Sequence, residues 1–300
     1  MRRLIWILTS AAALAAPPSL LRVPMSASGA PVTARELKAS VDGAAARVAA
    51  VRAPGDDLIL MLALDLTGDL TLADLARSAL AESLSTLPAR TWISVLRAQD
   101  GLQVLLDPTQ DRTRAAETIR AYPASGKAGL LDTVAAAARV ADAVLTRANV
   151  RVAVLYVTDS NVYNYREDFT NPVINSSDSR DLSRYFPEGL VQDKISKLET
   201  ALAATQPPLF IVHLDYRSDR LNEAYQSGLM KLTASTGGSA AFCRSATDID
   251  SSIARTLETI GALYSVTLEL PQRTGRMIQV QLEAGDRPLN YRNRYLLEKR

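Results

Sequence analysis

Acidic and hydroxyl side chains follow two apolar runs of this sequence, at the positions where each run ends. Asp65, Thr67 and Asp69 come directly after the run 58–64, and Asp159 follows the run 150–157. In an open α/β sheet the carboxyl ends of parallel strands meet along one rim, where ligands bind. We therefore expect three carboxylates and a hydroxyl to converge. An oxygen-only set of this kind suits Mg²⁺, Ca²⁺ or Mn²⁺.

Other chemistry has less support in the sequence. His213 is the only histidine and lies inside an apolar run, which predicts a hydrogen-bonded core residue rather than a catalyst. Cys243 is the only cysteine, so we expect a small buried side chain and no internal disulfide. The stretch 125–128 faintly resembles a phosphate loop, but Ala121 and Ala128 replace its leading glycine and its magnesium-binding hydroxyl. No nucleophile–base pair is evident, and we predict that the protein is not an enzyme.

Strand-length apolar runs alternate with helical patterns from residue 57 to residue 264. The runs 58–64, 92–96, 150–157, 209–214 and 239–242 suit buried strands, and helical spacing occupies 70–87, 108–122, 130–145, 190–204, 221–235 and 249–263. Asp100-Gly101 predicts a hairpin into one antiparallel strand at 102–106. This order predicts a doubly wound, mostly parallel, Rossmann-like α/β sheet with one antiparallel edge hairpin.

The two ends of the chain differ from this middle part. Arg2-Arg3, an apolar run over 4–16 and small residues around 13–15 and 26–30 are typical of a secretory signal peptide, which we expect to span 1–30. The Ala-rich stretch that follows predicts a helical extension over 31–56. Alternating segments at 264–270, 277–282 and 291–297 predict a small antiparallel β appendage over 265–300. We therefore expect a secreted or periplasmic protein that contacts a membrane only if the N-terminal segment is uncleaved.

The motifs at the strand ends resemble the von Willebrand factor type A (vWA) family, in particular a secreted bacterial branch. Asp65-x-Thr67-x-Asp69 is similar to the Asp-x-Ser-x-Ser opening of the family's metal-ion-dependent adhesion site, and 155–159 resembles the strand that supplies its distal aspartate. The loop 126–133 resembles the one that contributes a threonine. Segments 232–242 and 260–264 and the β-tail fit as well, so the resemblance covers roughly 57–297. It implies a vWA domain over 57–264 with Asp65, Thr67, Asp69 and Asp159 as metal ligands.

Two positions depart from the family's ligand pattern. Asp69 stands in place of the second serine, and Ala128 in place of the threonine. The resemblance implies that an added carboxylate makes the ion less electrophilic and that a missing oxygen weakens its cage. We therefore predict a degenerate site, with Mg²⁺ or another divalent cation as its cofactor if it still binds one. Lys127 adjoins the missing ligand, and we expect its ammonium partly to replace the ion between the carboxylates.

Asp69 has a second interpretation that needs no ligand. It directly precedes the helical pattern that begins at Leu70, and aspartate is a favoured N-cap residue. In this interpretation the carboxylate accepts backbone N–H groups of the first helical turn.

The segment 160–189 is the most distinctive surface in the sequence. A long loop with its own aromatic side chains at a ligand rim favours a recognition role, and tyrosine and arginine are common in binding hot spots. The alternative is a lid that packs on its own domain. The candidate partner-binding residues are Tyr163, Tyr165, Phe169, Tyr185 and Phe186.

Together these patterns favour a protein-binding module. The formal net charge is +2 and no basic stripe is present, so nucleic acid is not an expected partner. We expect another protein as the partner. Two alternatives stay open: a structural component of an envelope assembly with a vestigial site, and a metal-assisted hydrolase that uses the acidic rim.

Overall fold

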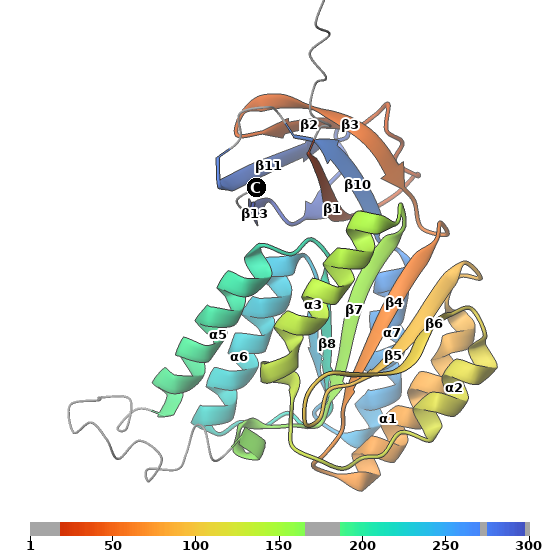
Figure 1. Ribbon diagram of the computed structural model, residues 1–300, viewed down its shortest axis with the longest axis vertical. Helices are drawn as coiled ribbons and strands as arrows, with labels where there is room; N and C mark the ends of the chain where they lie inside the picture. Colours follow the sequence, from red (N-terminus) through yellow and green to blue (C-terminus); the bar gives the residue numbers. More distant parts are fainter. Residues whose placement is uncertain (1–18, 166–186, 271–274, 298–300) are drawn as a thin grey trace, which may run out of the picture.

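The computed structural model describes residues 19–165, 187–270 and 275–297, which form two sheets (Figure 1). A six-stranded sheet is flanked by helices, and an antiparallel seven-stranded sheet lies at one end of it. The mixed α/β class predicted from the sequence is confirmed, but the second sheet is much larger than the predicted appendage. Within the described ranges, no helix is long and apolar enough to cross a membrane.

The apolar runs form the six-stranded sheet, whose order is β6-β5-β4-β7-β8-β9. Neighbouring strands are parallel except β5 and β6. Asp100 and Gly101 have φ values of 54° and 110°, as a tight hairpin turn requires, and the predicted antiparallel edge is confirmed. The strands are β4 (Leu58–Asp65), β5 (Thr91–Arg97), β6 (Gln103–Thr109), β7 (Arg151–Thr158), β8 (Leu209–His213) and β9 (Ala240–Phe242).

Each face of this sheet has its own apolar core, because side chains alternate along a strand. Leu60 and Leu62 pack in one cluster and Met61 and Ala63 in the other. The first cluster includes α1 (Leu70–Ser83), α2 (Arg112–Arg120) and α7 (Ile249–Gly261). The second includes α3 (Leu130–Arg147), α5 (Pro187–Ala203) and α6 (Arg220–Thr236). The loops after the strands meet at one end of the sheet, which we call the rim: residues 65–69, 97–101, 125–129, 158–165 and 214–219.

The seven-stranded sheet combines both ends of the described chain. Its order is β12-β1-β10-β3-β2-β11-β13, so N-terminal and C-terminal strands are interleaved. One apolar cluster, which includes Val23, Met25, Val266 and Val280, forms its core. The strands are β1 (Leu20–Ala27), β2 (Lys38–Val41), β3 (Ala44–Arg52), β10 (Tyr264–Glu269), β11 (Met277–Glu283), β12 (Leu289–Tyr291) and β13 (Arg294–Leu296).

The predicted helical extension over 31–56 is wrong, because this stretch forms β2 and β3. Alanine favours a helix, but the strands pair with β11 and β10, and tertiary pairing overrides propensity. Asp42 and Gly43 between them have φ values of 50° and 79°. An Asp-Gly pair is a strong hairpin signal, and it was present in the sequence.

The predicted boundary of the signal peptide at residue 30 conflicts with β1. This strand lies between β10 and β12, and its Leu21, Val23 and Met25 are buried. Removal of residues 1–30 would take a strand out of the interior of the sheet.

Two buried arginines bind carbonyl groups at helix C-termini close to the contact between the two sheets. Arg151 at the start of β7 donates to the oxygens of Gly261 and Leu263, at and after the end of α7, at 3.0 and 2.8 Å. Arg292, between β12 and β13, donates to the oxygens of Thr205 and Ala203 beyond and at the end of α5. Cations at these positions also suit the negative end of the helix dipole.

Candidate functional site

Asp65 ends β4 and is fully buried beneath the rim. Its carboxylate accepts hydrogen bonds from the N–H groups of Gly129 and Leu130 at 2.9 and 3.2 Å, and from the Thr158 hydroxyl at 3.0 Å. Burial raises the pKa of Asp65 to about 6, although these three hydrogen bonds oppose the rise, while the charge of Asp159 adds to it. Asp65 thus holds the N-terminus of α3 against the end of β4.

Asp159 follows β7 and is only 2% exposed. Its Oδ1 accepts the Thr67 N–H at 2.7 Å, and its Oδ2 accepts the Gly68 and Asp69 N–H groups, both at 2.8 Å. Burial raises the pKa of Asp159, and the three N–H groups lower it. The second carboxylate thus holds the loop that enters α1, and no ion pair neutralises either acid within the described part of the chain.

The three predicted carboxylates do not converge. Asp69 is exposed, and its Oδ1 accepts the N–H groups of Thr71 and Leu72 at 2.7 and 3.2 Å as the N-cap of α1. The capping interpretation of Asp69 is therefore confirmed. Thr67 contacts Ser160 instead, with 3.2 Å between the two hydroxyl oxygens. The rim brings together Asp65, Asp159 and the hydroxyl groups of Thr67, Thr158 and Ser160.

The loop before α3 contains Ala128, which stands at the position of the family's threonine ligand, and its neighbour Lys127. Ala128 is 8% exposed and packs in the core on the α3 face, so its methyl group supplies no oxygen at the threonine position. Lys127 is exposed, and its backbone N–H donates to Asp100 Oδ1 at 3.0 Å. The replacement of an ion by the Lys127 ammonium stays a prediction.

These residues do not fit a tightly held divalent cation. A carboxylate has about four acceptor positions, and the described hydrogen bonds occupy three on Asp65 and three on Asp159. Calcium and magnesium need six or more oxygen ligands. In the described ranges, no group of three or more His, Cys, Asp or Glu side chains is arranged to hold a metal.

Two rim residues that the prediction did not select are Thr158 and Ser160, both fully buried. The Thr158 hydroxyl donates to Asp65 and accepts the Ser160 N–H at 3.0 Å. It thereby connects the two acidic strand ends. Their position beside Asp159, just after an apolar strand, was the only sequence signal for them.

His213 is a core residue, as predicted. Its Nε2 lies 2.9 Å from the Ser160 oxygen, and its Nδ1 accepts the Asp215 N–H at 3.3 Å, so Nε2 carries the proton. Burial lowers the pKa of His213 to about 4, which keeps the ring neutral at physiological pH. Cys243 is likewise free and buried.

The predicted recognition residues divide into three groups. Tyr163 is 43% exposed, and its hydroxyl donates to Asp219 at 2.9 Å. Tyr165 is buried, with its ring 6.2 Å from that of Tyr225, so its prediction as a surface contact is wrong. Tyr165 packs against α6 instead, because Tyr225 of that helix offers it an aromatic face. Phe169, Tyr185 and Phe186 lie outside the described residues.

The rim also presents an aromatic and cationic surface beside β8 and β9. Tyr216 packs edge-on against Phe242, with ring centroids 6.3 Å apart, and both are partly exposed. The Arg244 guanidinium lies 5.3 Å from the Tyr216 ring centroid. Tyrosine and arginine in contact at a surface are the types enriched in binding hot spots.

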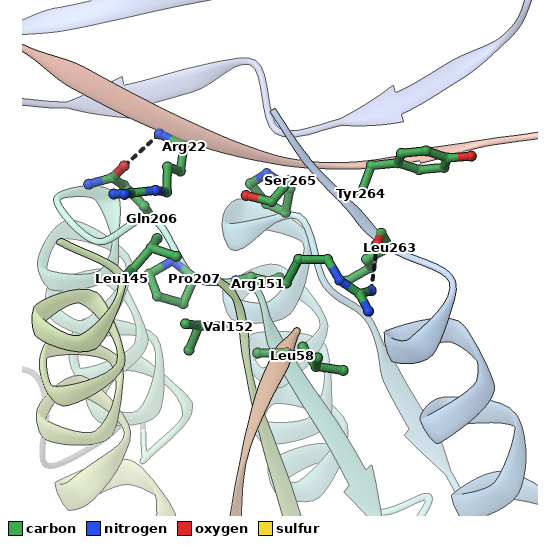
Figure 2. Close-up of a pocket in the computed structure, with 13 residues that line it drawn as sticks. Arg22, Leu58, Leu145, Arg151, Val152, Gln206, Pro207, Leu263, Tyr264 and Ser265 are labelled. Atoms are coloured by element: carbon green, nitrogen blue, oxygen red, sulfur yellow. Dashed lines mark hydrogen bonds between the residues drawn. The ribbon is translucent and has the colours of Figure 1, made fainter. Parts of the chain in front are cut away.

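A small pocket lies between the two sheets, at the opposite ends of the strands from the rim (Figure 2). Arg22, Arg151, Pro207 and Ser265 are among its lining residues. Figure 2 shows the Arg22 and Arg151 side chains directed to different sides, toward Gln206 and Leu263. The pocket has a volume of about 20 Å³, which is room for roughly one water molecule. We therefore regard it as a small gap in the contact between the two sheets, which we call the joint.

Comparison with solved structures returns vWA domains, the family that the strand-end motifs resemble. A von Willebrand factor type A protein from Catenulispora acidiphila is 13% identical, with a TM-score of 0.46 over 94% of this chain and 74% of that one. The vWF domain of the type V pili tip protein Mfa5 from Porphyromonas gingivalis is 12% identical, with a TM-score of 0.47 over 68% of this chain and 95% of that one.

A third similar structure is proximal thread matrix protein 1 from the mussel byssus, described with a zinc-occupied MIDAS motif. It is 10% identical, with a TM-score of 0.47 over 72% of this chain, which spans 48% of that protein. No family model matches the sequence, and no curated protein matches it either.

Proposed function

We propose that this chain is an exported, vWA-like protein-binding module whose adhesion site is degenerate and whose rim binds its partner without a divalent ion. The observation that carries the proposal is the binding of both rim carboxylates by backbone N–H groups. Asp65 and Asp159 each accept three hydrogen bonds from the rim itself. They act as fixed internal supports of the loops above them.

The same geometry favours binding over catalysis. Asp65, Asp159 and His213 are at most 2% exposed, and a general acid or base must come within hydrogen-bonding distance of its substrate. The exposed Tyr163 and the partly exposed Tyr216 of the rim, with the exposed Arg244 beside it, are instead residue types that suit a protein contact. We assign partner contact to this surface, together with the aromatic segment 160–189.

Site-directed photocrosslinking tests the contact surface. A photoreactive side chain replaces Tyr163 at the rim or, as a matched exposed control, Met277 in β11 of the seven-stranded sheet. We expect an adduct with one defined protein from position 163 and none from position 277, unchanged by a metal chelator. An adduct from position 277 alone would favour the structural envelope component, and chelator sensitivity would reject the metal-free site.

Calorimetric titration with Mg²⁺ and Mn²⁺ tests the degenerate site. We expect no saturable heat below about 1 mM ion for the natural chain, because Asp65 and Asp159 each already accept three hydrogen bonds and Ala128 supplies no oxygen. The double variant Asp69→Ser, Ala128→Thr restores both hydroxyl groups of the family pattern, and serine still caps α1. We expect it to gain saturable binding that a third change, Thr67→Ala, removes. Saturable binding by the natural chain would contradict the proposal.

We also propose that Lys127 contributes positive charge to the rim, because it neighbours Ala128 where the ligand is missing. If its ammonium acts on the carboxylates, Lys127→Met raises the pKa of Asp65 further. The carboxyl carbon shift of Asp65, followed by NMR against pH, measures this. An unchanged titration would reject the role.

A further inference from the structure

The first described strand, β1, is an interior strand of the seven-stranded sheet. It pairs antiparallel with β10 from Leu20 to Met25 and with β12 from Met25 to Ala27. The Ser19 oxygen already accepts the Leu270 N–H at 2.8 Å. The sheet therefore needs the chain from residue 19 onward.

β1 also takes part in the joint between the two sheets. The Arg22 N–H donates to Gln206 Oε1 at 2.6 Å, which joins β1 to the loop before β8 (Figure 2). On the core side, Val23 and Met25 are fully buried among side chains of β10 and β11. Loss of β1 would expose this core and free the edges of β10 and β12.

The later group of small residues, 26–30, lies at the end of β1 and in the loop that follows it. The carbonyl oxygens of Ala30 and Pro31 accept hydrogen bonds from the Arg287 guanidinium at 3.2 and 3.1 Å. Val32, directly beyond, is 3% exposed and belongs to the core of the sheet. Both sides of the Ala30–Pro31 bond are thus built into the fold.

We infer that a leader peptidase processes this chain upstream of Ser19, at the Ala15–Ala16 bond, so that β1 stays in the mature protein. Ala13-Leu14-Ala15 supplies the small residues that such cleavage requires. Water is the co-reactant: hydrolysis leaves the carboxyl group on Ala15 and a new amino group on Ala16. The inference rests on the export that the proposed function includes.

Two matched leucine variants of the full-length chain test the site, with N-terminal sequencing and intact mass as the measurements. Position 15 lies outside the described residues, and Ala30 is exposed. We expect the natural chain and Ala30→Leu to begin at Ala16, and Ala15→Leu to accumulate as precursor. A natural chain that begins anywhere other than Ala16, an intact Met1 included, would overturn the inference.

The outcome is separable from that of the binding experiment. A chain that begins at Pro31 and still crosslinks through position 163 would reject the processing site and keep the proposed function. A chain that begins at Ala16 but gives no adduct from position 163 would keep the processing site and reject the proposed function.

Discussion

Asp159 shows how a ligand-type residue can act as a structural support. Removal of its carboxylate takes the acceptor from three partly buried backbone N–H groups of the 67–69 loop, and each lost hydrogen bond costs about 1 kcal/mol. We expect Asp159→Ala to lower the free energy of unfolding by about 3 kcal/mol. Asp69→Ala, which removes only the α1 cap, is expected to cost about 1 kcal/mol. Urea unfolding measures both, and equal losses would contradict this assignment.

Asp65 and His213 make opposite contributions to the pH dependence of stability. The pKa of Asp65 is raised to about 6, so its contribution is present at low pH and is lost as the pH rises through that value. The pKa of His213 is lowered to about 4, so its contribution is present above its unfolded pKa of 6.5 and is lost as the pH falls toward 4. Between pH 4 and 6.5 the two largely cancel.

The variant Asp65→Asn removes one side of this balance. We expect its stability to fall more steeply than that of the natural chain between pH 7 and pH 4.5, by roughly 2 kcal/mol, since one pKa unit corresponds to about 1.4 kcal/mol. Urea unfolding at a series of pH values gives the two curves. Parallel curves would show that Asp65 titrates normally.

The sequence located the rim residues better than it located their side-chain partners. Asp65 and Asp159 were found because parallel strands end at one rim, which follows from the apolar runs alone. Their acceptance of backbone N–H groups could not be found in this way, since it depends on how the 67–69 and 129–130 segments turn. Asp69 had two interpretations, and only the path of the chain into α1 distinguishes them.

At the scale of elements, the strongest prediction is that the core side chains of β1 are needed for stability. Val23 is fully buried in β1, whereas Leu20 in the same strand is 45% exposed. We expect Val23→Asn to cost about 3 kcal/mol or more, because it removes apolar contacts and buries an amide without a partner. Leu20→Asn is expected to change stability by about 0.5 kcal/mol or less. Thermal unfolding measures the difference, and similar losses would mean that β1 is dispensable.

The element predictions succeeded where burial on both faces leaves an unbroken apolar run, as in β4 and β7. They failed for β2 and β3, whose alternation is blurred because alanine fills both exposed and half-buried positions. They also could not give the partners of the C-terminal strands. The N-terminal partners of β10, β11 and β12 lie more than 200 residues away in sequence, and local patterns contain no information on such pairings.

At the scale of the whole molecule, the joint depends on buried arginines. Arg292 is 5% exposed and donates to three carbonyl oxygens, two of them near the end of α5. Its neighbour Arg294 is exposed. We expect Arg292→Leu to accelerate amide hydrogen exchange throughout β1 and β10–β13, because docking of the two sheets weakens. Arg294→Leu is the matched control, and identical exchange in both variants would reject the role of Arg292.

The chain path through the two sheets also makes the molecule modular. β3 ends at Arg52 and β10 begins at Tyr264, and the two strands are hydrogen-bonded neighbours, with Arg52 opposite Ser265. The whole helical unit is therefore an insertion into what would otherwise be a simple β-hairpin. A short turn in place of residues 53–263 would keep every strand pairing of the antiparallel sheet. The inserted unit can therefore vary in length and structure without a change in the topology of the antiparallel sheet.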